Sequence, residues 1–234
     1  MGINKQESFS QIKAELKERF PLSKKIPGQS VELKIKDFKH TTRSKDIYSY
    51  QFLDKKRGNR VIIDDKKLVF ETNKYKGFVN LYENIEFITG KFEESYPLEK
   101  INSIGLRYIN QIDITPPKKP LNWKNLINSD LTCVPDNFLK NGGLCKDNMS
   151  RSMHFLEMSE EDYRLRFQFG MFNSEYPNSI SKKEFVLDYD CITIGEISPN
   201  DTLAITKKFN NIIYNWFEMS IGSELKDMMK DEGD

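Results

Sequence analysis

The sequence has little cysteine, and this scarcity excludes two classes of protein. Three cysteines in 234 residues are an odd number and too few for a small domain held together by disulfides. Cys133 and Cys145 lie too far apart for a zinc knuckle, and Cys191 would have to join them from a separate strand. We therefore expect reduced, partly buried thiols, no metal site and no cofactor.

Long hydrophobic runs are also missing. No stretch approaches the ~20 apolar residues that a membrane-spanning helix requires, and the first residues lack the apolar segment of a secretory signal. The chain begins Met1-Gly2, as a myristoylation signal does, but Gln6 stands where that signal carries serine or threonine. The sequence predicts a cytoplasmic protein without a membrane partner.

What is present is the composition of an ordinary globular protein, with 38% hydrophobic and 30% charged residues. The formal net charge of +1 hides an uneven distribution. Residues 1–76 contain 19 Lys and Arg against 10 Asp and Glu, whereas the remainder contains 17 against 25. This split predicts either an attraction between two halves of the chain or an anionic partner for the basic first third.

The first half of the chain has the pattern of a helix, several strands and a second helix. Ser8 is positioned to cap an apolar helical stripe, which Pro21 stops. A second amphipathic helix begins at Phe78 and ends near Pro97. Between the helices, three segments rich in β-branched and aromatic residues predict an antiparallel meander: residues 31–38, 47–54 and 60–71.

The second half follows a similar order. After a strand over 103–114, the run Pro116-Pro117-Lys118-Lys119-Pro120 interrupts both helix and sheet. We place a boundary there, between an N-terminal lobe of residues 1–115 and a C-terminal lobe of residues 121–234, and expect the lobes to form one compact unit.

Later strands alternate strictly between apolar and polar residues, first from Tyr163 to Phe172 and then from Phe185 to Cys191. A long final helix starts at Ser198, which is a capping residue followed by Pro199. The predicted fold class is α+β, with antiparallel sheets covered by helices in two similar helix–strands–helix lobes.

Arg107 lies inside an otherwise apolar strand and is the first candidate for a binding residue. An unpaired buried guanidinium costs several kcal/mol, so either a carboxylate pairs with Arg107 or an anionic ligand does. Tyr108 and Asn110 follow it on the same strand and join it as candidate ligand-binding residues.

Asp188 and Asp190 share one face of a strand and complete the candidate group. Such a pair can hold a metal, but no third acid has a useful spacing. If the two alternating strands form a hairpin, Arg164 and Arg166 lie almost opposite as cross-strand charge pairs. We therefore add Arg166, Asp188 and Asp190 to the ligand-binding candidates and predict no catalytic residue.

Two other features have simpler interpretations. His154 has no nucleophile in a recognisable context beside it, so we interpret it as a packed, hydrogen-bonded residue. Asn141-Gly142-Gly143 lacks the ending of a phosphate loop and predicts a turn.

The basic first third provides a second candidate surface, for nucleic acid. Aromatic residues there alternate along one strand and could stack bases: Tyr48, Tyr50 and Phe52. Basic residues that follow them could hold phosphates: Lys55, Lys56, Arg57 and Arg60.

The strand Gly105-Leu106-Arg107-Tyr108-Ile109-Asn110 also carries a resemblance. Together with Tyr75–Phe78, Leu187–Asp190 and Phe217-Glu218, it makes residues 60–230 resemble a sporadically distributed, functionally uncharacterised family of bacterial and archaeal proteins whose hallmark is a GLRYIN strand. The last helix has Asn210 where that family often has histidine. The resemblance implies a shared α+β fold but gives no information about activity, and the patchy distribution implies a defence or toxin–antitoxin-like gene set.

Three classes of function remain open. We expect first a non-catalytic protein that binds a partner protein, a second copy of itself or a ligand, with Arg107 as polar anchor, because no nucleophile, metal cluster or phosphate loop is visible. One alternative is an enzyme acting on a phosphorylated or nucleotide substrate, with Asp188 or Asp190 on a metal or a proton. The other is a nucleic-acid-binding module that uses the basic N-terminal region.

Overall fold

The computed structural model describes residues 5–36, 39–116, 119–132, 141–143 and 145–231, with side chains at all of these except 5–9 and 29–46. The chain divides into two compact units, Met1–Glu99 and Lys100–Asp234. Each unit contains a four-stranded antiparallel sheet and helices, so the predicted α+β class is confirmed. The division between units falls before the strand that precedes the proline-rich segment, and that strand belongs to the second unit.

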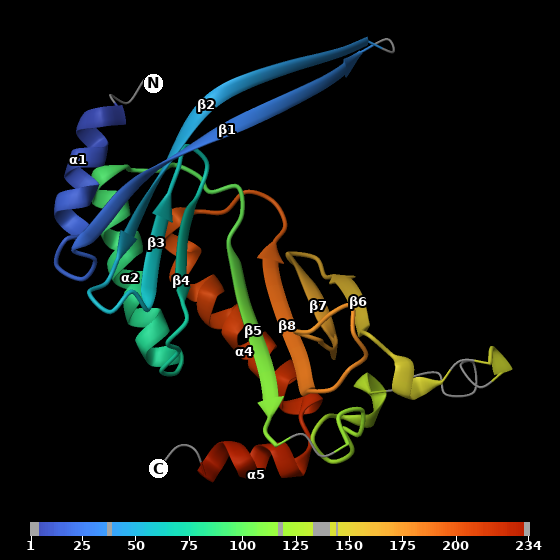
Figure 1. Ribbon diagram of the computed structural model, residues 1–234. Coiled ribbons are helices and arrows are strands. Elements are labelled where there is room, and N and C mark those ends of the chain that lie inside the picture. Colours follow the sequence, from blue (N-terminus) through green and yellow to red (C-terminus); the bar gives the residue numbers. More distant parts are fainter. Residues whose placement is uncertain (1–4, 37–38, 117–118, 133–140, 144, 232–234) are drawn as a thin grey trace. The chain divides into compact units, whose positions relative to one another are not determined.

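The first unit is a twisted sheet with two helices on one face (Figure 1). Its elements are α1 (Lys5–Leu16), β1 (Leu22–Lys36), β2 (Lys39–Leu53), β3 (Asn59–Ile63), β4 (Leu68–Thr72) and α2 (Phe78–Ser95), and the sheet order is β1-β2-β3-β4. Apolar residues of both helices, of the α1–β1 connection and of the inner sheet positions form the core: Ile12, Leu16, Phe20, Phe52, Val61, Ile63 and Ile88. Burial of this stripe, rather than one capping residue, determines where α1 lies.

Three details of the first unit differ from the expectations. The predicted cap at Ser8 is wrong, because α1 already includes Lys5 and Ser8 lies inside it. Residues 31–36 and 47–53 of two predicted strands belong to longer ones, since β1 and β2 each span 15 residues, and positions 37–38 lie outside the described residues. The predicted strand 60–71 is two strands, separated by a turn. In this turn the Asp64 carboxylate accepts hydrogen bonds from the backbone N–H groups of Lys66 and Lys67.

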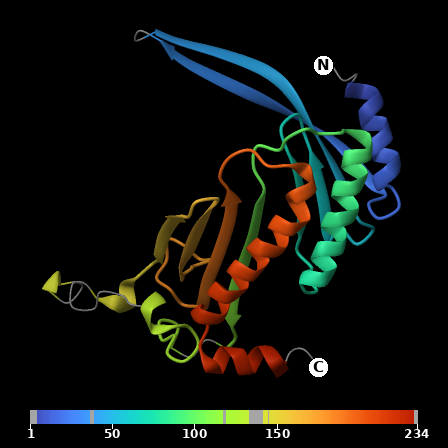
Figure 2. The same ribbon diagram turned by 180° about the vertical axis from the view of Figure 1, so that it is seen from behind.

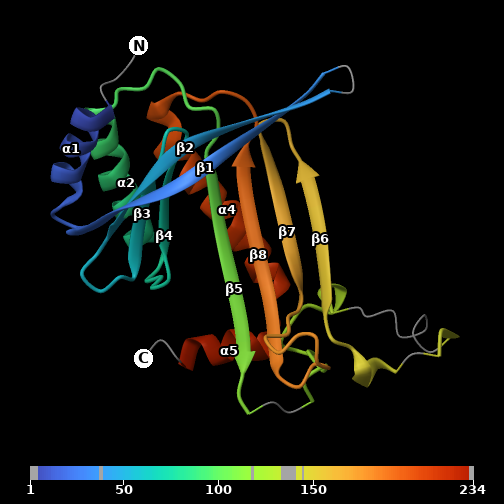
Figure 3. The same ribbon diagram turned by 45° about the horizontal axis from the view of Figure 1, so that its top comes forward.

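The second unit contains a separate sheet with a long helix across one face (Figure 2). Its strands are β5 (Gly105–Ile114), β6 (Ser152–Ser159), β7 (Tyr163–Met171) and β8 (Lys183–Thr193), in the order β5-β8-β7-β6 that Figure 3 shows. Short 3₁₀ turns lie at Ser129–Leu131, Lys146–Asn148 and Pro199–Asp201, and the helices are α4 (Thr202–Ser220) and α5 (Ser223–Asp231). All strand pairs in this sheet are antiparallel.

The core of the second unit lies between the sheet and α4. The Phe167 ring stacks on Tyr189 with centroids 4.6 Å apart, and the Trp216 ring meets it edge-on. The predicted alternation is confirmed, because the apolar series of both strands is buried on this face: Leu165, Phe167, Phe169 and Met171 in β7, and Phe185, Leu187, Tyr189 and Cys191 in β8. The opposite face of the same strands carries most of their charged residues, whereas Lys183 at the start of β8 shares the buried face.

Both ends of α4 are held locally. Ser198 accepts a hydrogen bond from the Asn200 backbone at 3.3 Å and so caps the 3₁₀ turn Pro199–Asp201. The predicted start of the long helix at Ser198 is wrong, because α4 itself begins at Thr202. After the helix, Gly222 donates from its backbone to Leu126, and a β-carbon at position 222 would lie only 2.0 Å from the Asn125 carbonyl oxygen. Gly222 therefore lets a loop backbone, rather than another helix, approach closely.

Candidate binding face of the second sheet

The face of the second sheet opposite α4, here called the outer face, carries a row of charges across all four strands. The pairing register places Arg107 of β5 opposite Asp190 of β8, Asp190 opposite Arg166 of β7, and Arg166 opposite Glu157 of β6. Paired positions share a face, so these four residues form one line of alternating sign, which we call the charged row.

Arg107 does not pair with the aspartate directly opposite. Its Nε donates to Oδ1 of Asp188 at 2.8 Å and its Nη2 donates to Oδ2 at 2.6 Å. Asp188 is buried, whereas the Arg107 side chain is 55% exposed. These hydrogen bonds raise the pKa of Arg107. Of the two alternatives considered for this arginine, the structure has the pairing with a carboxylate.

Arg166 also turns away from Asp190. Its Nε donates to Glu157 Oε2 at 2.8 Å, on the neighbouring edge strand. Arg164 adds a longer ion pair with the same glutamate, its Nε lying 3.6 Å from Oε1. Of these two arginines on β7, only Arg166 lies directly opposite an aspartate, because the register places Arg164 opposite Ile192.

Asp190 is left between two arginines that both bind other carboxylates. It is half-buried, and no residue in the described part of the chain donates a hydrogen bond to its carboxylate. Burial raises the pKa of Asp190, an effect that the charges of Arg107 and Arg166 oppose and that of Asp188 reinforces. Such a carboxylate is an acceptor that a hydrogen-bond donor from another molecule can satisfy.

Two apolar side chains flank this polar centre. The row next to the charged row consists of Ile109, Asp188, Gln168 and Phe155, again one residue from each strand. Its end members, Ile109 and Phe155, are 60% and 61% exposed. They lie on the two edge strands. The usual spacing of neighbouring strands places these two strands about 14 Å apart. Sequence reasoning missed both residues and Glu157, although the two-residue period of a strand over 152–159 places Phe155 and Glu157 on one face.

Two of the predicted ligand-binding residues lie on the opposite face. The Tyr108 hydroxyl donates to Asn210 Oδ1 of α4 at 3.0 Å, and the Asn110 amide donates to the Leu187 carbonyl at 3.3 Å. Strand alternation separates them from Arg107. The outer face therefore unites Arg107, Arg166, Asp188 and Asp190. On the other side, Tyr108 joins the sheet to α4, and Asn110 bonds within the sheet.

In the first unit, the predicted nucleic-acid residues have mixed surroundings. Lys55, Lys56 and Arg57 are exposed in the turn between β2 and β3. Arg60 donates from Nε to Glu71 at 2.9 Å, which neutralises its charge locally. Phe52 is fully buried in the core, so the predicted base-stacking role for Phe52 is wrong.

The remaining reactive side chains do not gather at a site. His154 is exposed on β6, where its ring stacks on Phe169 at a centroid distance of 5.1 Å. Cys145 is exposed and Cys191 buried, whereas Cys133 lies outside the described residues. Within the described ranges, no three His, Cys, Asp or Glu residues are grouped so that they could hold a metal ion.

The predicted turn at 141–143 is partly described. The chain leaves a helical residue at Asn141 and turns through Gly142 and Gly143, where Gly143 has a φ of 72° that favours glycine. The residues on either side of this turn, at positions 140 and 144, lie outside the residues that the structure describes.

No helix in the described parts of the chain is both long enough and apolar enough to cross a bilayer. Comparison of the chain with protein-family models, curated proteins and solved structures finds no match.

Proposed function

We propose that this protein binds a partner protein through the outer face of the second sheet. The observation that carries the proposal is Asp190, a half-buried carboxylate to which no described residue donates a hydrogen bond, on the same sheet face as exposed Ile109 and Phe155. A bound protein segment would donate an N–H group to Asp190 and cover the two apolar side chains. An acceptor at the centre of an interface specifies orientation, while burial of an aromatic residue supplies affinity.

The charge balance of this face favours a neutral segment over an anionic ligand. The charged row contains two arginines and two acids, and its next neighbours Arg164 and Asp188 also cancel. An anion at Arg107 would compete with Asp188, which already accepts hydrogen bonds from two nitrogens of that guanidinium. The alternative of an enzyme acting on a phosphorylated substrate therefore has less support, and an association with defence genes stays a prediction.

The test is selection from a peptide library displayed on phage, with the full chain as bait, followed by calorimetry on synthesised peptides. Selected peptides should lose about tenfold or more in affinity on Asp190→Ala and on Phe155→Ala, which is the effect of losing a central interface residue. Val79→Ala is the matched control, because Val79 is 73% exposed on α2 of the other unit.

Two results would overturn the proposal. One is that selection enriches no peptide. The other is that enriched peptides bind the Asp190→Ala and Phe155→Ala variants as tightly as the Val79→Ala control. Circular dichroism of each variant establishes that a loss of binding does not come from unfolding.

A further inference from the structure

The hairpin of β1 and β2 extends beyond the rest of the first sheet (Figure 1). The two strands pair along their whole length, from Leu22 opposite Leu53 to Lys36 opposite Lys39. Within β2, only Tyr50–Leu53 pair with β3. The longer part of the hairpin is therefore a two-stranded ribbon, with no third strand described beside it.

The two strands of the hairpin are strongly basic. β1 contains four lysines and β2 contains two lysines and one arginine, against Glu32 and Asp46, which is an excess of five positive charges. None of these seven basic residues is among the basic nucleic-acid candidates predicted from the sequence, although the predicted aromatic candidates Tyr48, Tyr50 and Phe52 lie in β2. The excess accounts for much of the positive charge of the first unit.

The register concentrates this charge on one face of the ribbon. Directly paired positions and every second position along a strand share a face. The pairs Ser30–Lys45, Glu32–Arg43, Lys34–Thr41 and Lys36–Lys39 therefore fall together. Five basic positions occupy this face, and Glu32 is the single acidic position among the described pairs there: Lys34, Lys36, Lys39, Arg43 and Lys45.

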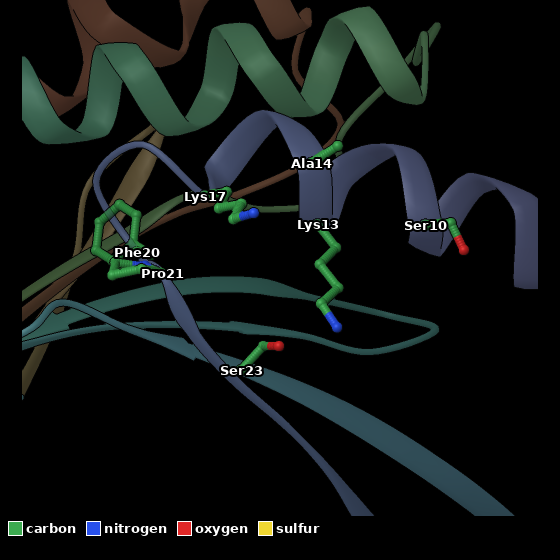
Figure 4. A pocket seen from close by; sticks show the side chains of 7 residues that line it. All are labelled: Ser10, Lys13, Ala14, Lys17, Phe20, Pro21 and Ser23. Carbon is green, nitrogen blue, oxygen red and sulfur yellow. The ribbon is translucent and has the colours of Figure 1, made fainter.

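A second basic feature lies at the base of the ribbon, where α1 meets the start of β1. A pocket of about 260 Å³ opens there (Figure 4). Its lining includes two exposed lysines, Lys13 and Lys17, and two serines, Ser10 and Ser23. β1 continues from the pocket with two more exposed lysines, Lys24 and Lys25. The Nζ atom of Lys25 lies 3.7 Å from the centre of the Tyr48 ring.

We propose that the β1–β2 ribbon binds double-stranded DNA, with the pocket at its base holding a flanking phosphate. The major groove of B-form DNA is about 12 Å wide and admits a two-stranded ribbon. The basic face supplies charges for the phosphates along the groove, and lysines beside serine hydroxyls supply donors for one further phosphate. The deep, narrow major groove of an RNA duplex does not admit such a ribbon.

The test is fluorescence anisotropy of the full chain with a labelled DNA duplex of about two helical turns. We expect binding at low salt, with log Kd rising linearly with log salt by about 0.9 for each phosphate contact. Absence of binding at about 50 mM salt, or binding that does not depend on salt, would overturn the proposal. Equal or tighter binding of an RNA duplex of the same sequence would overturn it as well.

Variants identify the surface. The double variants Lys34→Gln/Arg43→Gln and Lys13→Gln/Lys17→Gln should each lower the salt slope by about 1 per lost contact. Near physiological salt, each lost contact should weaken binding about fivefold. The matched control is Lys66→Gln/Lys67→Gln, which removes two charges in the β3–β4 turn and should leave the slope unchanged. A control that weakens binding as much as the ribbon variant would contradict the proposed surface.

Discussion

Arg107 and Asp188 form a two-point ion pair that runs diagonally between β5 and β8. The register places Arg107 opposite Asp190 and Asp188 opposite Ile109, yet the guanidinium reaches two residues along β8 to donate twice to Asp188. This diagonal pairing satisfies the buried aspartate and leaves the half-buried one available. This diagonal pairing therefore determines the electrostatics of the outer face.

Replacing Arg107 should destabilise the protein through Asp188. Arg107→Ala leaves a buried carboxylate without its two hydrogen bonds, at a cost of about 1–3 kcal/mol. Arg107→Lys should retain only part of the stability. Its ammonium group keeps the positive charge but cannot make the planar two-point contact. The measurement is the free energy of unfolding in urea, and Arg107→Ala/Asp188→Asn should recover part of the loss. Equal stability of Arg107→Ala and the wild type would contradict the pairing.

Asp190 should reduce stability at neutral pH. Burial raises its pKa, so the folded state holds this proton more tightly than the unfolded state does. The resulting stabilisation is complete below the unfolded pKa and is lost as the pH rises through the folded pKa. Asp190→Asn should therefore raise the unfolding free energy at pH 7 by about 0.5 kcal/mol, a modest figure because solvent screens a half-exposed group.

The pH profile separates this effect from a general one. The difference between Asp190→Asn and the wild type should disappear below about pH 3, where the aspartate is protonated in both states. Urea titrations across the pH range measure it. A difference that does not change with pH would show that ionisation of Asp190 is not the cause.

Two glycines should respond to alanine in opposite directions. At Gly222 a β-carbon would lie 2.0 Å from the Asn125 carbonyl oxygen, and backbone atoms cannot move aside cheaply. We expect Gly222→Ala to cost more than about 2 kcal/mol. Gly90 lies inside α2 with open space around it, so Gly90→Ala should add about 0.5–1 kcal/mol by favouring the helix. Thermal melting compares them, and a stable Gly222→Ala variant would refute the close approach.

The two described cysteines should differ strongly in reactivity. Burial raises the pKa of the Cys191 thiol to about 12, so almost no thiolate is present near pH 8. Cys145 is exposed. In a Cys133→Ser background, a thiol reagent should modify Cys145 quickly and Cys191 only when the protein unfolds. Mass spectrometry measures the modification of each thiol. Rapid reaction of both thiols in the native protein would contradict the burial of Cys191.

Local patterns predicted the strand faces of the second sheet because each depends on a period of two. Leu165, Phe167 and Phe169 are buried on one side, as their spacing indicates. The same rule argued against grouping Tyr108 with Arg107, since neighbouring residues of a strand lie on opposite faces. The prediction grouped residues by position in the sequence, and the structure separates them by face.

The charged row and the ribbon depend on pairing, which local patterns do not determine. Arg107 and Glu157 join one line only because β8 and β7 lie between β5 and β6 in a particular register. The length of β1 was underestimated because Pro27 and Gly28 interrupt its strand pattern, yet the backbone remains paired through both. Pairing energy with the long partner strand outweighs the weak local preference.

The strand order of the second sheet also sets the sequence of events during synthesis. β6 and β7 are joined by a short turn and can pair as soon as both leave the ribosome, with Ser159 opposite Arg164. β5 is made much earlier, but its only partner in the described sheet is β8, where Gly105 pairs with Ile192. The strand that carries Arg107 therefore has no partner within the described sheet until β8 has been synthesised. We expect this long-range pair to close more slowly than the β6–β7 hairpin, because pairs that are distant in the sequence must first close a long loop.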